Sequence, residues 1–403
     1  MNEESPAIPA PAEERHASWL ELFFDLVAVA GVAQIAHLLH GEPGAADVGL
    51  YVLLFLAFWT AWICFTLYGN VAGEGTHTRT VLAAMFGMAV MAAAVPGVHA
   101  GEDGQARALA LAYIVVRGLA SGVWRNRREI LVDWPAAQTS VGVIPWVVSL
   151  WAHEPARYWL WALGIALDLY VTFTVSARDI IENRRAHDRR EEPRSRRRET
   201  VLPVSFATPD ADHLGERLGL FVIIVLGEGV AQVIEAASDA PWNRRLYGLA
   251  AAAFFLLVAL WSLSFRHGYA GVPHLTARSL PARAALPLHC FVSGCLAALA
   301  AGLGAAAEHL DTLPDSTRWL LCSSLAGYFL LTGVAALRQP ADGRRRLLSV
   351  VLPCATAPLL IAGFGGGLGT VAVVWLLVAV TLWPTFYEGR RARRPGPDPR
   401  PEA

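Results

Sequence analysis

Long apolar runs, each near the length that crosses a lipid bilayer, alternate with short polar stretches along the whole chain. A helix rises about 1.5 Å per residue, so roughly 20 apolar residues cross a hydrocarbon core about 30 Å thick. The runs predict twelve membrane-spanning helices, at residues 19–39, 48–68, 80–98, 106–123, 137–152, 157–177, 215–236, 246–265, 284–305, 318–337, 347–363 and 369–387. The fifth and eleventh are the shortest and contain Pro145, Pro353 and Pro358, which indicate tilted, broken or half-buried segments.

Composition supports the same class of protein. Hydrophobic residues make up 55% of the 403 positions and charged residues only 17%, a balance too apolar for an ordinary soluble protein. Backbone polar groups in lipid must be satisfied within the segment, so apolar runs of this length are helices. We expect an all-α fold, a polytopic membrane helix bundle of about twelve transmembrane helices.

Polar stretches divide the chain into five parts. We expect disordered tails at 1–18 and 389–403, an Arg-rich loop at 178–212, and six-helix membrane halves at 19–177 and 213–388. Residues Arg178–Arg198 of the loop are either a binding site for anionic lipids or a solvated determinant of topology.

The basic residues, all 33 of them arginine, predict the topology. If the N-terminus is cytoplasmic and all twelve segments span, 26 arginines lie on the cytoplasmic side, 5 lie on the opposite side, and Arg117 and Arg217 lie within spans. Cytoplasmic loops of membrane proteins carry such an excess of positive residues. We expect a multi-pass protein with both termini in the cytoplasm.

Two segments separated by a constant 198 positions resemble each other. Leu20–Leu39 and Leu218–Ala237 share several apolar positions and the sequence GVAQ, at 31–34 and 229–232. This match predicts two six-helix parallel repeats, an arrangement in which sites often form between the halves near the membrane midplane. Chance similarity between apolar helices is the alternative.

The predicted span Gly215–Ala236 has ionisable residues within an otherwise apolar run. At about 100° per residue, Arg217, Glu228, Gln232 and Glu235 fall within roughly 60° of one another on one face. A charge near the bilayer centre costs roughly 2.5–3.5 kcal/mol on insertion scales, so such residues normally face a protein interior or a wet cavity. This helix is where we expect the chemistry to occur.

The first helix also carries polar residues on defined faces. Glu21 and Asp25 are four residues apart and share one face, whereas Gln34 and His37 lie on the opposite face. Arg117, in the fourth span, lies at about the depth of Asp25. We therefore expect Arg117 to pair with Asp25 or Glu21, since neither charge is stable alone in a low-dielectric interior.

The polar residues in the spans form two candidate groups. Asp168 lies near the middle of the sixth span, at about the depth of Glu228, and is either a proton carrier or a neutral carboxyl bonded to a neighbouring helix. The candidate pathway for an ion, a proton or a substrate consists of Asp168, Glu228, Gln232, Glu235, Gln34 and His37. The candidate buried ion pairs involve Glu21, Asp25, Arg117, Glu216 and Arg217.

Two stretches, WLELFFDLVAVAGVAQIAH and HLGERLGLFVIIVLGEGV, resemble the hallmark segments of the bacterial low-temperature-requirement protein A family. Supporting matches are FWTAWICFT, WSLSF, Tyr113, Arg117 and His289, and the resemblance covers most of residues 16–310. Members often have an acid after the aromatic that ends the eighth helix, where this chain has Arg266. The resemblance implies an integral membrane protein of the bacterial inner membrane, linked by name to growth in the cold, and implies no particular chemistry.

Sequence motifs for catalysis are missing. The cysteines lie inside apolar segments without a C-x-x-C spacing, and GFGGGLG at 363–369 follows a helix rather than a strand. We expect no enzyme, no metal and no cofactor. The expected partners are the lipid bilayer and an unidentified small solute or cation, with no nucleic acid.

Two functions remain open from the sequence. Glu228, Glu235 and Asp168 outnumber the basic residues at their depth, which favours a proton- or cation-coupled secondary transporter. A channel would need a ring of equivalent groups, which one chain of twelve helices supplies less naturally. The alternative is a structural or stress-related membrane protein in which every buried charge is a satisfied packing pair.

Overall fold

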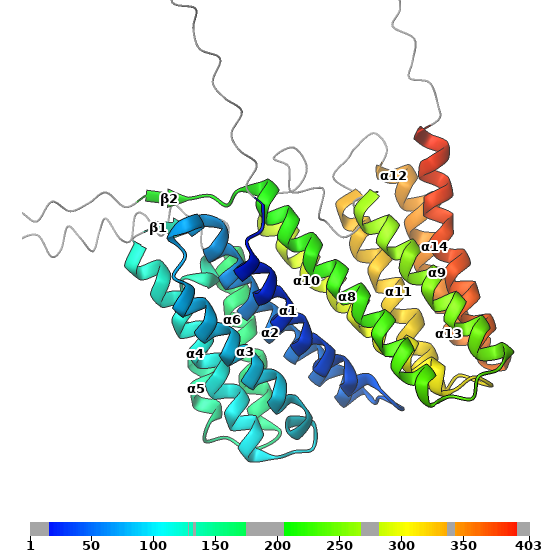
Figure 1. Ribbon diagram of the computed structural model, residues 1–403, viewed down its shortest axis with the longest axis horizontal. Helices are drawn as coiled ribbons and strands as arrows, with labels where there is room; N and C mark the ends of the chain where they lie inside the picture. The colour runs from blue at the N-terminus through cyan, green and yellow to red at the C-terminus, as the bar shows by residue number, and fades with distance from the viewer. Residues whose placement is uncertain are drawn as a thin grey trace, which may run out of the picture.

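A computed structural model describes residues 16–127, 129–131, 134–174, 205–266, 282–336 and 343–392. These residues form an elongated bundle of helices, which confirms the predicted all-α membrane fold (Figure 1). The predicted tails lie mostly outside the described residues, as does the loop stretch Arg178–Arg198.

The bundle is built from the following elements. The first half contains α1 (Trp19–Ala36), η1 (His37–Leu39), α2 (Ala45–Ala72), η2 (Gly73–Gly75), α3 (Thr78–His99), α4 (Asp103–Arg127), β1 (Glu129–Leu131), η3 (Pro135–Ala137), α5 (Val143–Ser149) and α6 (Ala156–Thr174). The second half contains β2 (Ser205–Ala207), α8 (Ala211–Asp239), α9 (Arg244–Arg266), α10 (Ala282–Glu308), α11 (Asp315–Ala336), α12 (Gly343–Arg346), a π-helical turn (Leu347–Val351), α13 (Leu352–Phe364), η6 (Gly365–Gly367) and α14 (Thr370–Ala392).

Nine helical segments among the described residues are long and apolar enough to cross a membrane. They correspond to α1 to α4, α8 to α10, the stretch Arg344–Gly367, and α14. The predicted sixth and tenth spans also contain long helices, α6 and α11. Figure 1 shows that α1 begins and α14 ends on the same side of the bundle, here named the terminal side, which requires an even number of crossings. The count of twelve stays a prediction.

The two weakest predicted spans differ in the structure. The eleventh belongs to a continuous 24-residue stretch, Arg344–Gly367, that tolerates its prolines. The fifth contains only the seven residues of α5, about 10 Å of helix at 1.5 Å per residue, which is too short to cross. The fifth segment is therefore broken, one of the forms predicted for it, and Gly142 and Pro145 mark where its helix starts late.

Helices in the two halves have the same neighbours. α1 packs against α2 and α3, as α8 packs against α9 and α10, and α3 packs against α4 as α10 packs against α11. α1 and α8 are in contact and run in the same direction (Figure 1). A parallel duplication would produce this pattern, and the internal repeat itself stays a prediction.

A short parallel strand pair on the terminal side was not predicted. β1 pairs with β2 in register, Glu129 with Ser205 and Leu131 with Ala207. The pair joins the end of α4 to the chain that leads into α8, so the predicted loop over 178–212 ends earlier than expected.

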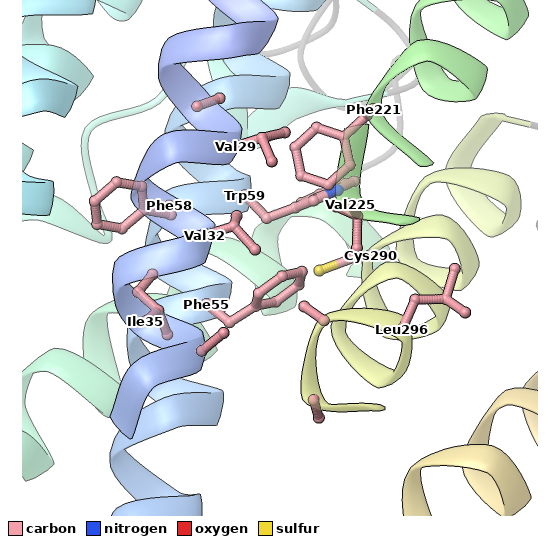
Figure 2. Close-up of a cluster of buried hydrophobic side chains, with 14 of the residues drawn as sticks. Val29, Val32, Ile35, Phe55, Phe58, Trp59, Phe221, Val225, Cys290 and Leu296 are labelled. Atoms are coloured by element: carbon pink, nitrogen blue, oxygen red, sulfur yellow. The ribbon is translucent and has the colours of Figure 1, made fainter. Parts of the chain in front are cut away.

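Apolar side chains from both halves meet in the centre of the bundle (Figure 2). Phe55 and Trp59 of α2 lie near Phe221 of α8 and Cys290 of α10. A Cβ at Gly31 of α1 would collide with a neighbouring ring of α2, so glycine is what permits this close helix approach. The halves therefore share one core, which places α1, α2, α8 and α10 together.

Candidate functional site

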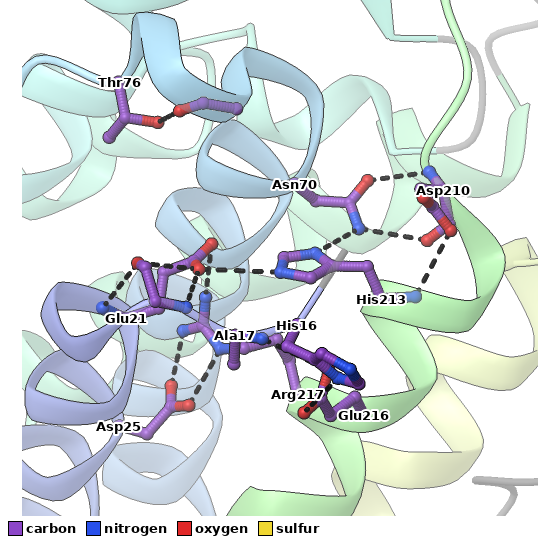
Figure 3. A network of polar contacts seen from close by, with 12 residues as sticks. His16, Ala17, Glu21, Asp25, Asn70, Thr76, Asp210, His213, Glu216 and Arg217 are labelled. Atoms are coloured by element: carbon purple, nitrogen blue, oxygen red, sulfur yellow. Dashed lines mark hydrogen bonds and ion pairs between the residues drawn. The ribbon is translucent and has the colours of Figure 1, made fainter. Parts of the chain in front are cut away.

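A buried network of charged side chains joins α1 and α8 on the terminal side of the bundle (Figure 3). Arg217 is 1% exposed and donates two hydrogen bonds to the carboxylate of Asp25, from Nε at 2.8 Å and from Nη2 at 2.6 Å. Its Nη1 lies 3.1 Å from Oε1 of Glu21. The indole of Trp62, in α2, donates to Asp25 Oδ1 at 2.7 Å. One arginine thus holds two carboxylates.

Glu21 also has a local role at the start of α1. Ser18 caps the helix, and its backbone N–H and hydroxyl both donate to Glu21 Oε2, at 2.8 and 2.9 Å. Gly69 of α2 leaves room for this carboxylate, because a Cβ there would lie 2.9 Å from Oε1. The capping sequence therefore fixes where Glu21 meets Arg217.

His213 extends the network, and its neighbours define its tautomer. Asn70 donates from Nδ2 to the Asp210 carbonyl at 3.0 Å and accepts at Oδ1 from the Asp210 amide at 2.8 Å, which fixes the amide orientation. The same Nδ2 lies 3.0 Å from His213 Nδ1, which must accept. The proton of neutral His213 is then on Nε2, 3.5 Å from Glu21 Oε2.

A small pocket of about 160 Å³ opens beside this network. Glu21 and Arg217 form its charged wall, and Phe24, Phe65 and Val81 form much of its apolar wall. The pocket is large enough for a few water molecules or a small ion and brings them to the charged groups.

A second buried ion pair lies deeper in the first half. Arg117 of α4 is 1% exposed, and its Nη2 lies 3.0 Å from Asp168 Oδ2 of α6. The same guanidinium donates to the carbonyl of Ala136 at 2.8 Å and to Cys64 Sγ at 2.7 Å. Because Ala136 belongs to η3, this arginine anchors the short segment that replaces the fifth span.

The predicted partners of Arg117 were wrong. The structure pairs Arg117 with Asp168, whereas Asp25 and Glu21 pair with Arg217. The expected pairing rested only on the similar depths of Arg117 and Asp25 along the membrane normal. Two residues at the same depth can face different helices. α4 packs against α3 and α5, while α8 packs against α1.

Glu216 does not belong to the buried network. Its side chain is partly exposed, and it accepts from the backbone N–H of Ala17 at 3.2 Å and lies 3.8 Å from His16. It holds the residues before α1 against α8.

The predicted pathway residues have different surroundings. Asp168 is next to Arg117, while Glu228 accepts a 2.7 Å bond from Gln232 on the same helix. Gln34, His37 and Glu235 are exposed. Asp168 and Glu228 therefore have different partners, and a common pathway for them stays a prediction.

His40 follows the first span, on the side opposite the termini. Its Nδ1 lies 3.0 Å from that of His37, with the rings edge to face. Burial, and next the neighbouring His37, lower the pKa of His40, which favours its neutral form. Within the described part of the chain, no three His, Cys, Asp or Glu side chains are placed to hold a metal ion.

His289 connects three helices through neutral hydrogen bonds. Trp59 Nε1 donates to its Nδ1 at 3.2 Å, and its Nε2 donates to the Leu218 carbonyl at 3.0 Å. The ring stacks on Trp62 with centroids 5.9 Å apart. His289 of α10 therefore contacts Trp62, whose indole donates to Asp25.

Sequence reasoning missed His213, Asn70 and Trp62. His213 precedes Arg217 by four residues and shares its face, which was a usable signal. Nothing in the sequence indicated that Asn70 would reach across to α8.

A model of the bacterial low temperature requirement A protein (LtrA) family matches residues 16–385. The chain belongs to this family. No curated protein matches it. Family membership and the apolar helices together make it a multi-pass membrane protein.

At the position where LtrA members often carry an acid, Arg266 lies over the ring of Trp261, 5.6 Å from its centroid.

Proposed function

We propose that this LtrA protein is a proton-coupled secondary transporter of the bacterial inner membrane, and that the network of Glu21, Asp25, Arg217 and His213 takes up the coupling proton. The observation that carries the proposal is a buried histidine beside a carboxylate that an arginine also holds. Nε2 of His213 lies 3.5 Å from Glu21, and Arg217 contacts both Glu21 and Asp25.

The charge of the network depends on His213. The Glu21 carboxylate lies 3.5 Å from Nε2 of His213 and would stabilise an imidazolium there, whereas the contact of Nδ1 with Asn70 stabilises the neutral ring. The two contacts therefore act in opposite directions on a proton at His213. Asp25 is held by two bonds from Arg217, which leaves the pair of Glu21 and His213 as the place for that proton.

Protonation of His213 has a structural consequence. The imidazolium would carry a proton on Nδ1, which would then face the Nδ2 donor of Asn70. Asn70 would have to turn away and give up its two bonds to Asp210, the residue that caps α8. The charged and polar groups around the imidazole are Glu21 of α1, Asn70 of α2, and Asp210 and Arg217 of the α8 segment. The Glu21 carboxylate and the Asn70 contact thus favour opposite states, which is what a proton switch requires.

A structural role is the second candidate, because the four buried arginines of the described residues all have carboxylate partners. In that case His213 would stay in one protonation state, and the pocket beside Glu21 would hold water only. The two functions differ in whether His213 titrates.

Reconstituted vesicles distinguish them. The purified protein is placed in vesicles that contain a pH-sensitive dye, and Na⁺, K⁺ or a panel of metabolite-sized neutral and anionic solutes is added outside. We expect at least one of them to drive proton movement in the parent protein. His213→Gln should remove it, because glutamine can accept from Asn70 and donate to Glu21 but cannot titrate.

His16→Gln is the matched control, since His16 is an exposed histidine that contacts only the rim of α8. It should retain proton movement. Undiminished proton movement in His213→Gln would refute the switch. Absence of proton movement in the parent protein with every solute would support the structural role.

The proposal includes the topology expected from the arginines, with both termini in the cytoplasm. Reporter fusions after Ala403 and within 178–212 should both report the cytoplasm. A fusion in the His40–Gly44 turn should report the opposite side. A cytoplasmic signal from that turn would contradict the assigned orientation.

A further inference from the structure

A groove of about 400 Å³ runs between α2, α10 and α11 on the side of the bundle opposite the termini. It begins at the turn between α1 and α2 and continues along α2 to Leu56. The opposing wall is formed by residues 290–298 of α10 and 316–324 of α11. The groove is separate from the network around Arg217 and does not depend on the proposed function.

The walls of the groove select an uncharged, apolar occupant. None of the side chains that line it is charged, and most are aliphatic or aromatic. Tyr51 lines it with its ring, because its hydroxyl donates to the Gly294 carbonyl at 2.6 Å. Three serines of α11, residues 316, 323 and 324, supply the little polarity that remains.

The length of the groove matches one leaflet of a bilayer. From Ala45 to Leu56 there are eleven helical steps, about 16 Å at 1.5 Å per residue. Half of a hydrocarbon core about 30 Å thick is about 15 Å. The groove thus extends from the membrane interface, where α2 begins, to about the midplane.

The rim of the groove is continuous with the lipid-facing surface. Val48, Val52, Phe291 and Trp319 line it and are also exposed on the outside of the bundle. Trp319 is near the start of α11, where tryptophans of membrane proteins meet the headgroup region. A molecule can therefore enter sideways from the lipid without crossing the protein.

We propose that this groove binds one acyl chain of a membrane phospholipid, drawn from the leaflet that surrounds the turn between α1 and α2. The apolar walls, the leaflet length and the lateral opening all fit this occupant. The inner end of the groove includes Leu56 and Cys290.

Photo-crosslinking tests the proposal. The full-length protein is reconstituted in vesicles that contain phosphatidylcholine with a diazirine near the end of one acyl chain. After irradiation, peptide mapping should find the crosslinks concentrated in residues 45–56 and 290–298. Val52→Phe, which narrows the groove from its rim, should reduce them to the level found on lipid-facing helices such as α9.

Val258→Phe is the matched control, because Val52 and Val258 are 45% and 41% exposed and only Val52 lines the groove. It should leave the crosslinks unchanged. Crosslinks spread evenly over all exposed apolar faces would overturn the proposal. Equal labelling of Val52→Phe and the parent protein would also overturn it.

Discussion

Arg217→Gln is expected to remove most of the folded protein from detergent extracts. Arg217 is buried, and its guanidinium contacts both Asp25 and Glu21. Its loss removes the guanidinium that holds the fully buried Asp25, and breaking a buried pair in this way costs about 3–5 kcal/mol. The fraction that elutes as a single peak in gel filtration after a heat challenge measures the effect.

A second substitution should partly restore the folded yield of Arg217→Gln. Asp25→Asn removes the charge that Arg217 held, while its amide oxygen still accepts from Trp62, so the double variant should yield more folded protein. Arg245→Gln is the control, because Arg245 pairs with Asp311 on the surface and such exposed pairs contribute no more than about 1 kcal/mol. Equal loss in the single and double variants would show that Arg217 stabilises the fold through something other than its charge.

Arg117→Gln should destabilise the protein by a similar amount, also about 3–5 kcal/mol. Two effects combine here, since Asp168 loses its cation and the carbonyl of Ala136 loses its donor. Thermal aggregation of the detergent-solubilised protein measures the change. Because the anchored segment is the short α5 region, limited proteolysis should also detect new cleavage between 135 and 150.

The choice of rescuing acid distinguishes the two buried pairs. Asp168→Asn should partly restore the stability that Arg117→Gln loses. Asp25→Asn should not, because Asp25 pairs with Arg217 instead. Recovery with Asp25→Asn instead would mean that the assigned pairing is incorrect.

Hydropathy alone predicted most of the fold. Apolar runs of about 20 residues have few alternatives to a membrane helix, and the arginine distribution supported an even number of crossings. The fifth span is the exception, because part of it is an irregular segment rather than a helix. Arg117 stabilises that segment by donating to the carbonyls of Ala136 and Thr139. Pro145 and the shortness of the run indicated a problem there, but not its solution.

The site was predicted only in part. The sequence identified Arg217, Asp25 and Glu21 as buried charges because each lies in an apolar run. It did not pair them correctly, since the pairing depends on how far each helix is rotated about its axis and on which helix lies next to it. Contacts such as Asn70 with Asp210 form between residues 140 positions apart and have no local signal.

The parallel pairing of β1 with β2 brings the end of α4 beside the chain that enters α8. Contacts of α1 with α8 and α10, and of α2 with α8, join the halves along the rest of their length. These contacts, all between described residues, set the register in which the halves meet. A gene divided within 175–204 would still encode two fragments with every described contact, so the bundle has what it needs to assemble from two separate polypeptides.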